Sequence, residues 1–223
     1  MAGIAGSAAY GVAKGANIIA LRVGGKNERP SSNKMINGIS SMVTRHTARR
    51  AEVDFRGSVA TMSLGGSFIS TALEEAVAQA SAVGIHFVVS AGNRADDACN
   101  YSPGRLSFGS NIVTVGSINV KDQRSFFSNY GPCVAVYAPG EKIVTTGPNY
   151  PTESVVVSGT SHAVPHVSGL MAVFLSMDET LKTAPGMMKT KIIDLALIFE
   201  LDQLQLDSLD SGLLLYNGKE QRA

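Results

Sequence analysis

Serine, threonine and histidine side chains that could perform acyl-transfer chemistry gather in residues 158–170, which read SGTSHAVPHVSGL. The segment follows a valine-rich stretch that predicts a strand, and its own apolar residues predict a helix, so Ser161 falls at the start of that helix. The free N–H groups and the positive dipole end of a first helical turn stabilise an oxyanion that forms beside a serine hydroxyl. Ser161 is therefore a candidate nucleophile. For an isolated Thr-Ser pair, however, a simple helix N-cap is the more common role.

The elements that would position Ser161 alternate along the chain. Helical spacing predicts helices over residues 35–43 and 71–83, the second with Thr71 and Glu74 as a capping box and Gly84 as its stop. Apolar stretches rich in β-branched residues predict buried strands at residues 18–23, 58–64, 85–90, 112–115 and 134–137. Strands that alternate with helices favour a parallel sheet covered by helices, here in one domain of residues 1–223.

Composition excludes several classes of protein. The 223 residues carry 19 Lys and Arg against 18 Asp and Glu, and no basic block could follow a nucleic-acid backbone. No apolar run approaches the roughly 18 to 20 residues that a membrane span requires. Nucleic acid and membrane are therefore not expected as partners. Cys99 and Cys133 lack the spacing of a metal or redox site, and composition leaves two free thiols and one disulfide both open.

Segment 158–170 resembles the serine-nucleophile signature of the subtilisin-like serine proteases, Gly-Thr-Ser-x-Ala-x-Pro-His-Val-x-Gly. Further segments resemble this family in the same order: 10–18 the stretch after its catalytic histidine, 63–66 its substrate-lining strand, and 90–93 its oxyanion-hole turn. Residues 100–103, 126–131 and 213–218 are similar to the proteinase K and aqualysin branch. The resemblance implies an α/β fold of three layers, a parallel sheet flanked by helices with the Ser161 helix near its centre.

The resemblance implies roles for single residues. Ser161 becomes the nucleophile that attacks a peptide carbonyl, and Asn93 becomes the side-chain donor to the oxyanion, joined by the Ser161 backbone N–H. Taken without the resemblance, Asn93 is typical of a turn and segment 63–66 of a strand end. The implied partners are a polypeptide substrate and a propeptide or protease inhibitor, and no cofactor is expected. The residues implied to border the substrate are Ser63, Leu64, Gly65, Ser90, Ala91 and Gly92.

The resemblance also concerns the two cysteines. Members of the aqualysin-like branch join a cysteine before Asn-Tyr-Ser-Pro to one just after Ser-Asn-Tyr-Gly, and Cys99 and Cys133 occupy these two positions. The resemblance therefore implies a disulfide, and with it a secreted protein or another oxidising compartment. No signal peptide is visible after Met1.

Two catalytic residues of the family have no counterpart in the sequence. The family's catalytic histidine lies in Gly-His-Gly-Thr-His-x-Ala-Gly-x-Ile-Ala-Gly, but the chain opens MAGIAG, so that histidine and the upstream aspartate are missing. The histidines present are His46, expected on a solvated helix face, His86 in a buried strand, His162 and His166. His162 is a poor general base for Ser161, because adjacent residues of a helix do not face each other. We expect a domain that lacks its N-terminal strands and is an inefficient protease alone.

Alternative hypotheses follow from this departure. The domain could be a catalytically dead subtilase that binds peptides through residues 63–65, or the product of a decayed gene. A lipase-type hydrolase is disfavoured, because the serine lacks the Gly-x-Ser-x-Gly elbow.

Two smaller departures concern ligands. Ala135 stands where the calcium-binding branch has an aspartate, so we expect no metal there. Glu28, Arg29 and Pro30 replace the Gly-Ser-Gly of the second substrate-flanking strand, and Pro30 removes one backbone donor. The register of a bound substrate is therefore not fixed by the sequence.

Overall fold

The computed structural model describes residues 1–25, 30–150, 152–198 and 210–215. Its α-helices are α1 (Ala2–Gly6), α2 (Ser32–Arg49), α3 (Thr71–Ala82), α4 (Thr160–Met177) and α5 (Pro185–Leu195). Its short 3-10 helices are η1 (Ala98–Asn100), η2 (Gly104–Ser107) and η3 (Glu179–Leu181). Its strands are β1 (Ser58–Met62), β2 (Ile85–Ser90), β3 (Val113–Ile118), β4 (Val136–Pro139), β5 (Ile143–Thr146), β6 (Ser154–Val157), β7 (Leu197–Ile198) and β8 (Leu213–Leu214).

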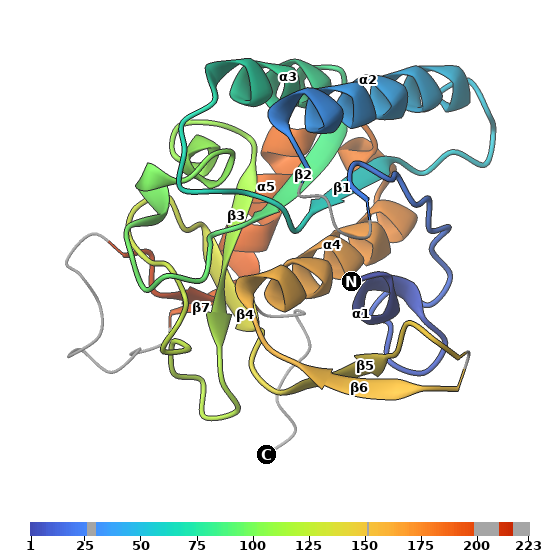
Figure 1. Cartoon of the computed structure of the whole chain (residues 1–223). Helices are drawn as coiled ribbons and strands as arrows, with labels where there is room; N and C mark the ends of the chain where they lie inside the picture. Colours follow the sequence, from blue (N-terminus) through green and yellow to red (C-terminus); the bar gives the residue numbers. More distant parts are fainter. Residues whose placement is uncertain (26–29, 151, 199–209, 216–223) are drawn as a thin grey trace.

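A six-stranded sheet in the order β1-β2-β3-β4-β8-β7 forms the middle layer, with every neighbouring pair parallel except β7 and β8. All residues of β2 and β3 are buried, as strands covered on both faces must be. Helices α2 and α3 cover one face and α4 and α5 the other (Figure 1). Helix α4 contacts β1, β2, β3 and β4, so it lies across the centre of the sheet. The predicted three-layer architecture is therefore confirmed.

Two apolar clusters hold the layers together. On the α2 and α3 side, Leu73 and Val77 pack with Phe87 and Val89. On the α4 and α5 side, the cluster includes Val164, Val167, Met171, Met188 and Ile192 against Val88, Val113, Val115 and Val136. Alternate residues of β2 thus serve opposite faces, which is the period-two geometry of a strand. Burial of both faces fixes the register of the central strands.

The buried strand predicted for residues 18–23 is wrong. The structure has no strand there, and Ile18 and Ile19 are 50% and 48% exposed. The Ile18 side chain lies against Gly6 of α1 and the Val23 side chain against Gly38 of α2, so the segment rests on helices instead of joining β1. Strand formation needs a hydrogen-bonding neighbour, and β1 pairs only with β2 within the described residues. Within the described residues, β1 is therefore an edge strand of the sheet.

The solvated position predicted for His46 is also wrong. The side chain is 2% exposed, and its ring packs edge-on against Phe55. His46 Nδ1 lies 3.0 Å from Ser58 Oγ and Nε2 lies 3.1 Å from the Val83 carbonyl oxygen. These two partners satisfy both ring nitrogens, so a polar residue of α2 can turn toward the start of β1.

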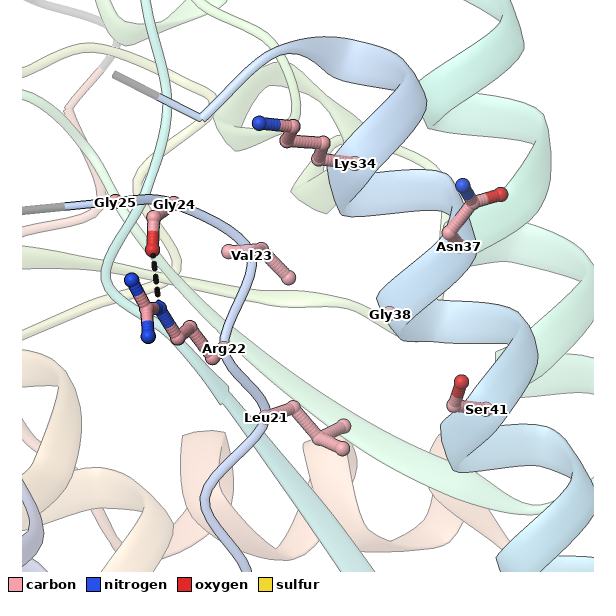
Figure 2. Close-up of a pocket in the computed structure, with 9 residues that line it drawn as sticks. All are labelled: Leu21, Arg22, Val23, Gly24, Gly25, Lys34, Asn37, Gly38 and Ser41. Carbon is pink, nitrogen blue, oxygen red and sulfur yellow. Dashed lines mark hydrogen bonds between the residues drawn. The ribbon is translucent and has the colours of Figure 1, made fainter. Parts of the chain in front are cut away.

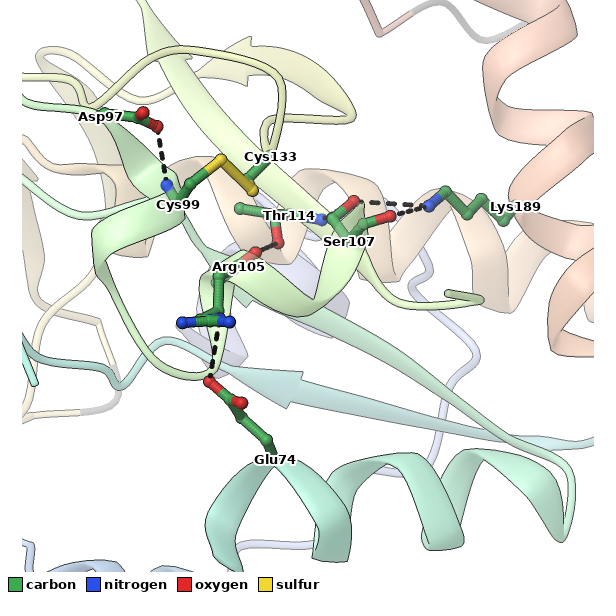
Figure 3. The surroundings of a disulfide bond; sticks show 9 residues. Glu74, Asp97, Cys99, Arg105, Ser107, Thr114, Cys133 and Lys189 are labelled. Carbon is green, nitrogen blue, oxygen red and sulfur yellow. Dashed lines mark hydrogen bonds and ion pairs between the residues drawn. A yellow bond between two sulfur atoms is a disulfide. The ribbon is translucent and has the colours of Figure 1, made fainter. Parts of the chain in front are cut away.

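Helix α3 begins one residue earlier than its capping pattern predicted. Its N-cap is Ser70, whose Oγ accepts a hydrogen bond of 3.4 Å from the Leu73 N–H. Glu74 does not close a capping box: its carboxylate accepts from Ser102 Oγ and pairs with Arg105 at 3.6 Å (Figure 3). Gly84 follows the helix with φ +105°, as a helix stop requires. None of the helices in the described ranges is long and apolar enough to cross a membrane.

Candidate active site

Ser161 is the second residue of α4, so the predicted position at a helix start is confirmed. The hairpin of β5 and β6 delivers the chain to this point, and Gly159 is the N-cap with φ +146°. This φ lies in a region that L side chains avoid, so the turn requires glycine. Ser161 therefore lies in the first turn of α4, where the backbone N–H groups have no partner within the helix.

Ser161 and Ser63 are joined by reciprocal hydrogen bonds. Ser161 Oγ donates to the Ser63 carbonyl oxygen at 3.3 Å, and Ser63 Oγ donates to the Ser161 carbonyl oxygen at 2.9 Å. Ser63 follows β1 directly, so these bonds bring the predicted substrate-lining segment beside the predicted nucleophile. A carbonyl oxygen cannot take a proton from serine at neutral pH, so this arrangement positions the hydroxyl without activating it.

Asn93 lies beside the same helix start. Its Oδ1 accepts two hydrogen bonds from Thr160, one from the backbone N–H at 2.8 Å and one from Oγ1 at 2.9 Å. Thr160 Oγ1 also accepts from the Gly92 N–H at 3.3 Å. With Oδ1 held on Thr160, Asn93 Nδ2 lies next to Gly159, 3.5 Å from where a β-carbon on that glycine would be. The amide donor of Asn93 therefore faces the turn that carries Ser161.

The two predicted substrate segments lie at the same edge of the sheet. Met62 pairs with Val89 in the β1–β2 register, so Ser63 and Ser90 leave neighbouring strands side by side. Ser90 and Ala91 are buried, whereas Gly65 is exposed. Gly66 donates to the Ser102 carbonyl oxygen at 3.2 Å, which fixes one side of segment 63–66. The structure thus brings Ser63–Gly65 and Ser90–Gly92 together with Ser161 and Asn93.

The histidines do not complete a catalytic pair. His162 Nδ1 lies 3.5 Å from the position of a β-carbon on Gly159, and burial lowers the pKa of its ring. The His166 ring bonds to the His162 carbonyl oxygen at 3.0 Å, and burial lowers its pKa as well. His86 is 1% exposed in β2, as predicted. In the part of the chain that the structure describes, neither a histidine nor a carboxylate hydrogen-bonds to Ser161 Oγ.

The disulfide between Cys99 and Cys133 is present, which confirms the pairing and excludes free thiols (Figure 3). Asp97 caps η1 by accepting from the Cys99 N–H at 2.8 Å, as Figure 3 shows. The bond joins the loop that follows Asn93 to the segment that leads into β4. The disulfide therefore restrains the loop that follows Asn93.

Two further expectations concerned a metal at Ala135 and the second substrate-flanking strand. Ala135 is buried, and its N–H donates to the Thr114 carbonyl oxygen at 2.9 Å. The described residues contain no cluster of three or more His, Cys, Asp or Glu side chains that could hold a metal ion. Glu28, Arg29 and residues 216–218 of the branch motif lie outside the described residues.

A groove of about 430 Å³ lies between residues 21–25 and the first half of α2 (Figure 2). On the side of residues 21–25, Arg22 donates from Nε to the Gly24 carbonyl oxygen at 3.0 Å. Lys34, Asn37 and Ser41 line it from α2, as Figure 2 shows. The predicted catalytic and substrate residues do not line this groove, and sequence reasoning gave no sign of it.

Comparison with known proteins identifies the family. The pattern of the Subtilase family matches residues 1–213. The chain is 39% identical to "Subtilisin-like serine protease pepC" of Aspergillus niger, over 84% of this chain and 37% of that protein. It is 43% identical to "Cerevisin" of Saccharomyces cerevisiae, over 79% of this chain and 27% of that protein.

A solved structure agrees with these relatives. The "Crystal structure of a cold adapted subtilisin-like serine proteinase" superposes with a TM-score of 0.84 at 35% identity, over 98% of this chain and 73% of that chain. The chain spans a quarter to a half of the length of the curated relatives described here, including 50% of "Subtilisin-like serine protease Rho m 2.0101" of Rhodotorula mucilaginosa. The sequence, the fold and the arrangement around Ser161 agree, and the chain belongs to the subtilase family of serine proteases.

Proposed function

We propose that this chain supplies the nucleophile, the oxyanion site and part of the substrate groove of a serine endopeptidase. The observation that carries the proposal is Ser161 at the start of α4, with Asn93 held by Thr160 so that its amide donor faces the same turn. Serine at a helix start beside a fixed amide donor is suited to acyl transfer, because the negative charge that develops on the carbonyl oxygen meets preformed donors.

The reaction follows from this geometry. Ser161 Oγ forms a bond to the peptide carbonyl carbon while its proton passes to a general base, and the oxyanion accepts from the Ser161 N–H and Asn93 Nδ2. The peptide C–N bond then breaks as the departing amine takes that proton, which leaves an acyl-enzyme on Ser161 for water to hydrolyse. The substrate lies extended along Ser63–Gly65, which follow β1 and offer backbone groups at the sheet edge.

The general base is the part of the mechanism that this chain does not contain in the described site. Ser161 Oγ bonds only to the Ser63 carbonyl oxygen among the described residues. In subtilisin itself, a member of this family, loss of the catalytic histidine lowers kcat by about 10⁶-fold. We therefore propose that residues 1–223 alone are nearly inactive, and that a histidine from a further segment of the protein activates Ser161.

The second candidate is a peptide-binding module without catalysis. It is favoured by one observation, the Ser161 hydroxyl engaged with a carbonyl oxygen instead of a base. Peptide binding through Ser63–Gly65 requires neither Ser161 nor a positioned Asn93, so the preserved oxyanion geometry supports the peptidase. The disulfide supports an oxidising compartment, and we propose a secreted protein whose partners are peptide substrates and a propeptide or inhibitor.

Labelling with a fluorophosphonate tests the proposal, with Ser161→Ala as the matched control. The longest protein product of the gene and residues 1–223 alone are treated side by side, and cleavage of a chromogenic peptide is measured on both. We expect labelling at Ser161 and cleavage in the long product and almost none in the short one. A long product that is folded but unlabelled, and that still binds peptide, would establish the binding module instead.

A further inference from the structure

Asn129 is a fully buried side chain whose hydrogen bonds reach the turn that bears Asn93. We call residues 90–96 the oxyanion turn. Asn129 Oδ1 accepts from the Arg94 N–H at 2.9 Å and from the Asp96 N–H at 3.2 Å, and Nδ2 donates to the Ala91 carbonyl oxygen at 2.9 Å. Its backbone N–H donates to the Gly92 carbonyl oxygen at 3.0 Å. One residue thus holds the oxyanion turn on both sides of Asn93.

Gly92 is what allows this close approach. Its φ is +110°, and a β-carbon added there would lie 2.4 Å from Asn129 Nδ2. A glycine is therefore required both by the backbone conformation and by the amide that packs against it. The Asn129 amide occupies the space that a side chain at position 92 would need, so a residue larger than glycine would clash with it.

The segment that carries Asn129 is itself held in place. Backbone bonds run from the Tyr130 N–H to the Asp96 carbonyl oxygen at 3.1 Å and from the Ala98 N–H to the Tyr130 carbonyl oxygen at 2.8 Å. The disulfide between Cys99 and Cys133 closes the same pair of segments a few residues further along (Figure 3). These bonds tie the backbone of Asn129 to the oxyanion turn, so the two segments cannot shift independently of each other.

The position of Asn93 depends on two sets of contacts. Thr160 holds the amide oxygen, and Asn129 holds the backbone from which the Asn93 side chain projects. Asn93 is exposed, so packing does not restrain its side chain as it would in a core. A misplacement of about 1 Å in a catalytic group can cost on the order of 100-fold in rate.

We propose that Asn129 is a positioning residue for the oxyanion donor, which sets kcat by fixing the backbone on either side of Asn93. The proposal rests on the peptidase function proposed above. It predicts a kcat effect without a matching KM effect, because the oxyanion exists only in the transition state.

Asn129→Asp is the first variant, made in the active full-length protein. Aspartate has the same shape and keeps an oxygen acceptor for the Arg94 and Asp96 amides, but it places a second oxygen against the Ala91 carbonyl. We expect kcat to fall about 10- to 100-fold with KM changed less than about twofold, since loss of a complete oxyanion donor costs about 10²- to 10³-fold in subtilisin, a relative of this protein. Asn129→Ala is the second variant, and it removes all three side-chain bonds.

Ser125→Ala is the matched control. Ser125 is fully buried in the same segment, and its hydroxyl bonds to Ser117 Oγ at 2.8 Å instead of to the oxyanion turn. It should lower thermal stability while leaving kcat unchanged. An equal loss of kcat in Ser125→Ala and Asn129→Asp would overturn the proposal, because the effect would then follow stability alone.

A double-mutant cycle with Asn93→Ala separates positioning from general damage. If Asn129 acts through Asn93, the Asn129→Asp change should lower kcat less than about twofold once the amide donor is absent. Fold-changes that multiply in the double variant would overturn the proposal. The ¹⁵N side-chain amide signals of Asn93 give a second readout: they should shift in Asn129→Asp and stay in place in Ser125→Ala.

Hydrolysis by the wild-type protein distinguishes the two proposals. An inactive but folded wild type would overturn the proposed function, and the catalytic role of Asn129 with it. An active wild type whose kcat and Asn93 amide signals are unchanged by Asn129→Asp would overturn the role of Asn129 alone.

Discussion

Acid should destabilise this protein through a buried histidine far from the catalytic chemistry. His86 lies in β2 with 1% of its surface exposed, and burial lowers its pKa from 6.5 to about 4. The neutral ring is favoured in the folded state, so the unfolded chain binds more protons between these two pKa values. The stability that the neutral His86 ring contributes is therefore fully present above about pH 6.5. As the pH falls from there to about 4, the free energy of unfolding decreases, and below about pH 4 His86 causes no further loss.

The size of the effect follows from the two pKa values. Each pH unit between them costs about 1.4 kcal/mol, and integration from pH 7 to pH 5 gives a loss of about 2 kcal/mol from His86. Burial also lowers the pKa of His46, which adds to the loss in the same direction. Urea unfolding at pH 7, 6 and 5, read by circular dichroism, measures the total.

His86→Leu isolates this contribution, because leucine suits a buried strand position and does not titrate. The variant should lose about 2 kcal/mol less than the wild type between pH 7 and pH 5. Val89→Ala in the same strand is the control: it removes buried methyl groups, so it should lower stability equally at both pH values. A pH dependence in His86→Leu identical to that of the wild type would refute the assignment to His86.

Three further predictions concern single contacts. Replacing Cys99 and Cys133 together by serine should lower the free energy of unfolding by about 3 to 4 kcal/mol in urea titrations, because the bond closes a loop of 34 residues. In the active full-length protein, Thr160→Val should lower kcat about 10-fold at unchanged KM, since Asn93 Oδ1 loses one of its two donors. Lys189→Met should cost about 1 to 3 kcal/mol in thermal unfolding, because Nζ donates to two carbonyl oxygens of the loop around η2.

Each of these has a result that contradicts it. Equal stability of the oxidised wild type and the double serine variant would mean that the disulfide does not restrain the unfolded chain. A Thr160→Val variant whose KM rises while kcat holds would place Thr160 in substrate binding. If Lys189→Met unfolds at the wild-type temperature, water satisfies those carbonyl oxygens equally well.

The sequence predicted best where one local pattern has only one structural meaning. Residues 85–90 form a strand with the predicted ends, because an apolar β-branched run covered by helices on both faces has no other stable arrangement. The run at 18–23 is also mostly apolar, but it finds no hydrogen-bonding neighbour beyond β1, so it rests on α1 and α2. His46 was misplaced for a related reason: its partners, Ser58 and Val83, are remote in sequence and invisible to helical periodicity.

In the candidate site, too, local motifs were predicted from the sequence and contacts between distant residues were not. Ser161, Asn93 and the disulfide were predicted because motifs carry them, and the structure places the serine, the amide and Ser63 side by side. Thr160 was read only as part of a motif, and Asn129 only as part of a branch signature. Their roles depend on contacts with residues more than thirty positions away, for which no local pattern gives a signal.

In the proposed peptidase, the oxyanion site and the general base are separable parts. The contacts described for Asn93 and its turn come from Thr160 in α4 and from Asn129 in the segment before β4. None of these contacts involves a histidine, so the donor geometry does not depend on the base. A transition-state analogue whose charge is borne on oxygen therefore tests the oxyanion site by binding alone. Its affinity for residues 1–223 must fall in Asn93→Ala even though no peptide is cleaved, because preformed donors act on the charge and not on the proton transfer.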